Sequence, residues 1–135
     1  MAQYEHLPIY KASFDLLLHI EKVVAGFSRA NKFSIGADLR ALARRCLRLI
    51  VRANNVRDRL PVLEELRVSL EELKILIRVC KETRAFANFK SFESCVNQVV
   101  TILRQNEGWL KSLSGNKTTG RRPESPTEPR TGVRT

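Results

Sequence analysis

Apolar residues recur every three or four positions along most of the chain, which is the periodicity of an amphipathic α-helix. Proline, glycine, serine and asparagine interrupt this pattern, and no run alternates between apolar and polar residues as a half-buried β-strand does. The pattern therefore predicts four helices and no sheet. Their expected spans are residues 8–27, 37–55, 60–85 and 91–113.

Each predicted helix has an apolar stripe that needs burial against its neighbours. Because the predicted connections are short, successive helices are expected to lie side by side in opposite directions. The predicted fold class is all-α, an antiparallel up-down-up-down four-helix bundle. The stripes, in chain order, are Tyr10, Phe14, Leu17, Val24 and Phe27; Leu39, Leu42, Ala43, Cys46, Ile50 and Ala53; Leu66, Leu70, Leu73 and Ile77; and Phe92, Val96, Val99, Leu103 and Leu110.

The composition changes after the fourth predicted helix. Residues 114–135 contain glycine, proline, serine, threonine and charged residues but only one apolar side chain, Val133. Such a segment cannot bury enough apolar surface to offset the entropy of ordering it. We predict a bundle domain over residues 1–113 and a disordered basic tail over residues 114–135.

Positive charge dominates the chain. It has 24 lysines and arginines against 14 aspartates and glutamates, a formal net charge of +10, which favours polyanionic partners. The surplus is densest in residues 39–59, "LRALARRCLRLIVRANNVRDR", where seven arginines stand with one acid, Asp58. This segment is the main candidate for a functional surface.

The arginines of the second predicted helix form one face opposite its apolar stripe. Arginines four residues apart repel each other slightly, so helix stability gives no reason for this face. Guanidinium groups bind phosphate bidentately and stay charged at cellular pH, so we predict contact with nucleic acid, without sequence specificity, or with a partner. The alternative is a solvated face, or one paired with carboxylates of the third helix. The candidates are Arg40, Arg44, Arg45, Arg48, Arg52, Arg57 and Arg59.

The third predicted helix has apolar residues on two faces. Val68, Ile75 and Val79 fall on the side opposite its core stripe, flanked by Glu71 and Glu72. A helix that is apolar on two sides has more surface to bury than one bundle covers, which predicts a homo-oligomer interface. The alternative is three scattered surface aliphatics.

Catalytic and metal-binding patterns are missing from the sequence. Cys46, Cys80 and Cys95 form no C-x-x-C pair, so we expect neither a disulfide framework nor a metal site and assign them to core packing. No nucleotide, hydrolase or zinc-protease motif occurs, and we predict a protein that is not an enzyme and needs no cofactor.

His6 and His19 stay unassigned, and Trp109 either packs at the bundle end or stacks on a base. Without a signal peptide or a long apolar run, the expected location is the cytoplasm, with no membrane and no small-molecule substrate.

Four stretches of the chain, taken together and in order, resemble one protein family. They are "LPIYKASFDLLLHI" at 7–20, "KFSIGADLRALARRCLRLIVRANNVRDR" at 32–59, "LEELRVSLEELKILIRVCKE" at 63–82 and "GWLKS" at 108–112. They are similar to the accessory variability determinant proteins of diversity-generating retroelements. The resemblance covers about residues 7–112, and none of its motifs is catalytic.

The resemblance implies a four-helix bundle that assembles into a barrel-like homopentamer with a basic surface. It also implies partnership with the reverse transcriptase of the element, its template-repeat RNA and the adenine-mutagenised cDNA made for mutagenic retrohoming. All seven candidate arginines lie in a matching stretch. One departure is Phe27-Ser28, where family members often have Phe-Pro. The bundle proteins encoded in ribosomal RNA intervening sequences share the helix count and basic character, and as structural adapters they offer a second interpretation.

Overall fold

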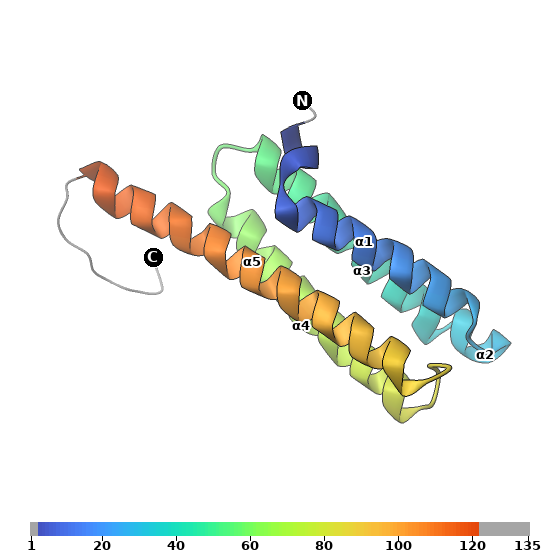
Figure 1. The fold of residues 1–135 in the computed structure, drawn as a ribbon. Coiled ribbons are helices and arrows are strands. Elements are labelled where there is room, and N and C mark those ends of the chain that lie inside the picture. Colours follow the sequence, from blue (N-terminus) through green and yellow to red (C-terminus); the bar gives the residue numbers. More distant parts are fainter. Residues whose placement is uncertain (1–2, 122–135) are drawn as a thin grey trace.

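A computed structural model describes the backbone of residues 3–121 and the side chains of residues 4–114. Within this part of the chain the protein is all-α, as predicted, with four long helices (Figure 1). A short 3-10 helix precedes them, and a single helical turn lies between the first two. The elements are η1 (Gln3–His6), α1 (Pro8–Ala25), α2 (Arg29–Lys32), α3 (Ile35–Asn55), α4 (Leu60–Glu82) and α5 (Phe89–Arg121).

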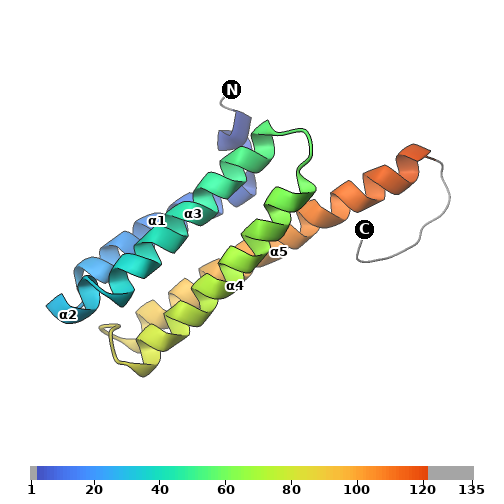
Figure 2. The ribbon, with the colours of Figure 1, turned by 180° about the vertical axis from the view of Figure 1, so that it is seen from behind.

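The long helices form an antiparallel up-down bundle, which confirms the predicted architecture. Helix α1 packs against α3 and α5, and α4 packs against the same two helices. Going around the bundle the order is therefore α1, α3, α4, α5, so α1 and α4 face each other across the diagonal. The two opposite views agree on this arrangement, in which every helix runs against both of its neighbours (Figures 1 and 2).

Local chemistry accounts for where the helices begin. Pro8 and Pro61 stand in the first turn of α1 and α4, where the missing N–H leaves no hydrogen bond unmade. Ahead of α5, the side-chain oxygen of Asn88 accepts a hydrogen bond of 2.9 Å from the N–H of Ser91, which caps the first turn. Helix α5 consequently begins at Phe89, two residues before the predicted start at 91.

The predicted end of the fourth helix is wrong. Helix α5 continues to Arg121, eight residues beyond residue 113, so the first part of the predicted tail is helical. Single glycines at 115 and 120 weaken a helix without breaking it. The first residue that cannot continue a helix is Pro123. Residues 122–135, the rest of the predicted tail, lie outside the described residues.

The core stripes of α3 and α4 match the prediction. Every predicted α4 residue is buried, and in α3 only Leu42 is half-buried instead. In α5 the predicted Val99 and Leu110 are buried, whereas the other three predicted residues are half-buried and flank an inner row. That inner row is Cys95, Val99, Ile102 and Asn106.

The predicted stripe of α1 is partly wrong. The buried residues are Ile9, Ser13, Leu16, Ile20 and Val24, while Phe14 lies on the outside of the bundle. At 100° per residue the true stripe is rotated by roughly 60° from the predicted one. Three consecutive leucines at residues 16–18 made both rotations compatible with the sequence, and contact with α3 and α5 selects one.

Candidate nucleic-acid interface

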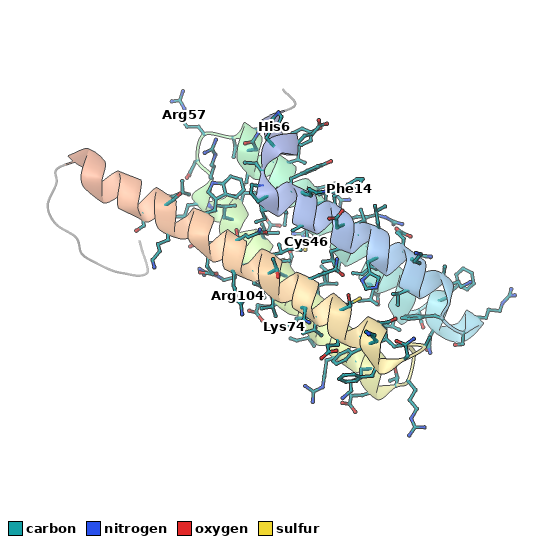
Figure 3. All side chains as sticks on the ribbon, in the orientation of Figure 1. His6, Phe14, Cys46, Arg57, Lys74 and Arg104 are labelled. Atoms are coloured by element: carbon teal, nitrogen blue, oxygen red, sulfur yellow. The ribbon has the colours of Figure 1, made fainter. Side chains whose placement is uncertain are left out.

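The arginine face lies on the outer side of α3, opposite the buried stripe. Arg44, Arg45, Arg48 and Arg52 are exposed, and Arg40 is half-buried. Arg57 projects away from the bundle from the connection between α3 and α4 (Figure 3). The face predicted from the helical wheel therefore exists, and the neighbours of each guanidinium decide what it can bind.

The amino half of this face, Arg40, Arg44 and Arg45, is paired with acids on the two flanking helices. Glu21 of α1 forms ion pairs with two of these arginines: its Oε1 lies 2.8 Å from Arg40 Nε, and its Oε2 lies 2.8 Å from Arg44 Nη2. Arg45 forms an ion pair with Glu65 of α4. These pairs join α3 to the helices on either side of it.

The carboxyl half of the face, which we define as Arg48, Arg52 and Arg57, has no such partners. All three side chains are exposed, and none makes an ion pair or hydrogen bond with any other residue in the described part of the chain. Arg48 and Arg52 stand one helical turn apart, about 6 Å along the axis. This half offers three hydrated guanidinium groups that an external anion can bind.

Arg59 belongs to the interior of the fold instead. Its Nε donates to the carbonyl oxygen of Ala53 at 2.9 Å, and Nη2 donates to that of Asn54 at 3.5 Å. These oxygens lie in the last turn of α3, where carbonyls lack helical partners. The guanidinium also lies 5.9 Å from the ring centroid of Trp109, so the half-buried tryptophan packs at the bundle end. Arg59 is thus a weaker candidate for external contact than its place in the arginine-rich segment implied.

Polar contacts bridge all four seams between neighbouring helices, and sequence reasoning found none of them individually. Beyond the arginine pairs of α3, Arg67 of α4 binds Glu107 of α5 through two hydrogen bonds of 2.6 and 2.9 Å. Hydrogen bonding to Glu107 is the main cause of the raised pKa of Arg67. Between α1 and α5, His19 Nδ1 lies 2.6 Å from Gln98 Oε1. Spacing within one helix carries no signal for such contacts between helices.

The three cysteines are all buried, which confirms their assignment to the core. Burial raises the pKa of Cys46 and Cys95 to about 12 and that of Cys80 to about 11. Each thiol therefore keeps its proton at neutral pH, whereas a nucleophilic cysteine reacts as the thiolate. Cys95 Sγ lies 3.6 Å from His19 Nδ1, the ring nitrogen that also faces Gln98.

The second apolar face of α4 is exposed on the single chain. Val68 is 64% exposed and Ile75 62% exposed, with Val79 beside them. A matching feature that the sequence analysis missed lies on α1, where Phe14 and Leu18 are also exposed and Phe14 stands on the outer side of the helix (Figure 3). Because α1 and α4 lie across the bundle from each other, the two apolar faces point in opposite directions.

Three further observations limit how the site is interpreted. Among the residues that the structure describes, no group of three or more histidine, cysteine, aspartate and glutamate side chains is placed to hold a metal ion. No helix within residues 3–121 is both long enough and apolar enough to cross a bilayer. The sequence matches neither a known family model nor a curated protein.

Proposed function

We propose that the protein is a non-enzymatic, nucleic-acid-binding accessory protein. In this role it partners the reverse transcriptase of a diversity-generating retroelement and its template RNA during mutagenic cDNA synthesis and retrohoming. The partner and pathway rest on the resemblance of residues 7–112 to the accessory variability determinant proteins. The nucleic-acid contact rests on the chain's own surface.

One observation carries the nucleic-acid contact. The carboxyl half of the arginine face consists of three exposed guanidinium groups that no acid in the described residues neutralises. The whole chain has a net charge of +10, so its field attracts a phosphate backbone over a longer range. Phosphate contacts of this kind supply affinity and position but no base sequence, so we propose binding of low sequence specificity.

The test is the salt dependence of RNA binding by the variant Arg48→Gln, Arg52→Gln, Arg57→Gln. Each phosphate contact makes the negative slope of log affinity against log salt steeper by about 0.7 to 0.9. The slope of the triple variant should therefore be shallower than that of the wild type by about 2 to 3. At 0.1 M salt this corresponds to a loss on the order of 100-fold. Fluorescence anisotropy with a labelled RNA measures both quantities.

A matched control removes the same charge elsewhere. Lys11, Lys74 and Arg78 are each engaged in surface ion pairs with residues three or four positions away on their own helix. Their triple change to Gln should alter affinity far less than the arginine variant. Equal losses of affinity in both variants would show that the arginine face acts only through the net charge of the chain. Unchanged RNA affinity in both variants would contradict the proposed contact.

We also propose that copies of the chain assemble through the two apolar faces described above. The α4 face of one copy would pack on the α1 face of the next, because the two lie on opposite corners of the same bundle. Such a heterologous contact closes into a ring when the rotation between copies permits. A homopentamer is the ring size that the family resemblance implies.

The assembly is tested with Val68→Asp and Ile75→Asp together. Both side chains are exposed on the single chain, so the variant should keep its helical circular dichroism and run as a monomer in light scattering. Leu18→Asp on α1 should have the same effect if α1 is the opposing surface. A wild-type monomer at micromolar concentration would eliminate the proposed assembly.

A structural adapter of the ribosomal RNA intervening-sequence type is the second candidate. It is favoured by the four candidate arginines that already bond within the fold, Arg40, Arg44, Arg45 and Arg59. In that role the free arginines would pair with acids on a partner protein. The triple Gln variant would then lose co-purification with the reverse transcriptase while its affinity for RNA stayed the same.

A further inference from the structure

A chain of aromatic rings crosses the end of the bundle opposite Arg57. Phe27, after α1, meets Phe86 of the α4–α5 connection edge to face, with ring centroids 5.9 Å apart. Phe86 contacts Phe92 at 5.8 Å, and Phe92 contacts Phe89 at 5.5 Å. The rings therefore link the two connections that lie at this end in both views (Figures 1 and 2).

Two phenylalanines at this end are turned toward solvent. Phe33, which caps the end of α2, is 72% exposed, and Phe89, the first residue of α5, is 60% exposed. The ring of Phe89 packs against the ring of half-buried Phe92, and this contact restricts its position. The exposed part of each ring gains nothing for the folded single chain, because the hydrophobic effect favours only area removed from water.

The two connections that carry these rings contain basic residues, and the nearest acids of α4 and α5 are Glu82 and Glu93. Segments 26–34 and 83–90, which cover the two connections and the first two residues of α5, contain four basic residues and no acid. None of the four basic side chains makes an ion pair or side-chain hydrogen bond within residues 4–114. We name Phe33 and Phe89, together with these four residues, the aromatic end. The four are Arg29, Lys32, Arg84 and Lys90.

Arg84 has a backbone conformation that is costly for arginine. Its φ is 62°, the one positive φ of a residue other than glycine in the described chain. It follows the last turn of α4, where Ala85 N–H donates to the carbonyl oxygen of Cys80 at 2.8 Å. This helix-ending motif ordinarily has glycine at the left-handed position. A strained residue that adds charge to an exposed end is evidence for a role outside the fold.

We infer that the aromatic end binds single-stranded nucleic acid, with bases stacked on Phe33 and Phe89 and phosphates held by the surrounding cations. Unpaired bases stack on aromatic side chains while a basic surface tracks the backbone. A duplex keeps its bases stacked on each other and cannot use the rings. This inference rests on the proposed function and adds a strand preference that the arginine face does not supply.

The aromatic end and the carboxyl half of the arginine face are separate contacts. Ser34 and Arg52 mark the two ends of α3 and are 18 residues apart, about 27 Å at 1.5 Å per residue. Substitutions at one end therefore leave the other in place. This separation allows each contact to be tested alone in the full chain.

The experiment uses a single-stranded RNA that contains 2-aminopurine, whose fluorescence falls when the base stacks, and a duplex of the same sequence. Phe33→Ala with Phe89→Ala should weaken single-strand binding by on the order of tenfold for each ring lost and abolish the quenching. Duplex affinity and the slope against salt should not change, because no charge is removed. Quenching and affinity equal to wild type would overturn the inference.

Conservative changes separate stacking from simple apolar contact. Phe33→Leu with Phe89→Leu keeps apolar side chains but removes the aromatic faces, so it should bind single strands as poorly as the Ala variant. Phe33→Trp with Phe89→Trp should retain the preference for single strands. Full single-strand binding by the Leu variant would overturn the inference, because the aromatic faces would then be unnecessary.

Arg84 gives an independent test through opposite effects on stability and binding. Arg84→Gly removes the strain and should raise the melting temperature by about 5 °C while weakening single-strand binding severalfold. Arg84→Gln, which loses the charge and keeps the strain, should weaken binding without the gain in melting temperature. Unchanged binding in both variants would remove Arg84 from the contact.

Failure of this inference is distinguishable from failure of the proposed function. If the Arg48, Arg52 and Arg57 variant loses affinity and the phenylalanine variants do not, the proposed function stands and the aromatic end is excluded. If the wild-type chain binds neither strand form, both are overturned.

Discussion

The amino and carboxyl halves of the arginine face use the same residue type on the same helix side, yet they differ in every contact. Arg40 and Arg44 share Glu21, and Arg45 binds Glu65, whereas Arg48 and Arg52 bind nothing in the described chain. The difference lies on the neighbouring helices. Because α1 runs antiparallel to α3, a step toward Arg52 corresponds to a step from Glu21 toward the amino-terminal turns of α1, where Asp15 pairs with Lys11 of its own helix.

This contrast separates arginines that hold helices together from arginines that face outward. An exposed ion pair contributes little, roughly 0.2 to 1 kcal/mol, so even the paired half stabilises the bundle only modestly. The unpaired half contributes no contact energy to the folded chain. Its three unpaired charges are the basis of the proposed nucleic-acid contact.

The largest effect on stability is expected at Arg59, which is bonded within the fold like the arginines of the paired half. Arg59→Ala removes two hydrogen bonds to the carbonyls that end α3 and the contact with Trp109. We expect a loss of about 2 kcal/mol in the free energy of unfolding. Denaturant titration measures it, with Arg57→Ala, two residues earlier and unpaired, expected to change stability by less than about 0.5 kcal/mol.

Removing the acids that pair with Arg40, Arg44 and Arg45 should make the amino half of the face behave like the unpaired carboxyl half. Glu21→Gln with Glu65→Gln removes the ion pairs of three guanidinium groups and adds two units of net charge. RNA affinity should rise on the order of tenfold, with a steeper dependence on salt. Glu71→Gln with Glu82→Gln adds the same charge on α4 and serves as the control. A gain no larger than in this control would show that the position of the arginines is irrelevant.

The smallest effect is expected from Arg44→Gln with Arg45→Gln. This variant breaks one ion pair on each side of α3 and should lower the free energy of unfolding by about 1 kcal/mol. The melting temperature should fall by roughly 4 °C, while RNA affinity should fall less than in Arg48→Gln with Arg52→Gln. If the two double variants lose affinity equally, the halves do not differ in function.

The sequence predicted the buried side of α3 and α4 well. In α3 the stripe had one possible orientation, and in α4 the leucine-rich stripe is buried rather than the second apolar face, as predicted. In α1 consecutive leucines allowed two orientations, and packing against α3 and α5 selected the one that exposes Phe14. The end of α5 was misplaced because glycine only weakens a helix and no proline occurs before residue 123.

In the candidate site, too, the sequence predicted what depends on one helix and missed what depends on neighbouring helices. The helical wheel identified an arginine face because the relation between positions i and i+4 is fixed by the geometry of one helix. It gave no means to separate Arg44 from Arg48, because their partners lie on other helices. The aromatic end was not predicted at all, since Phe33 and Phe89 are far apart in sequence and come to the same end of the bundle only after the chain turns back on itself.

The sequence by itself determined four amphipathic helices, their antiparallel order, a basic face on α3 and a second apolar face on α4. These features follow from periodicity, loop length and charge, which are local properties of the chain. Only the tertiary structure decided which arginines are neutralised, which side of α1 is buried and which rings remain exposed. The physical reason is that ion pairing and burial depend on what a neighbouring helix brings within a few ångströms, and no local pattern encodes that distance.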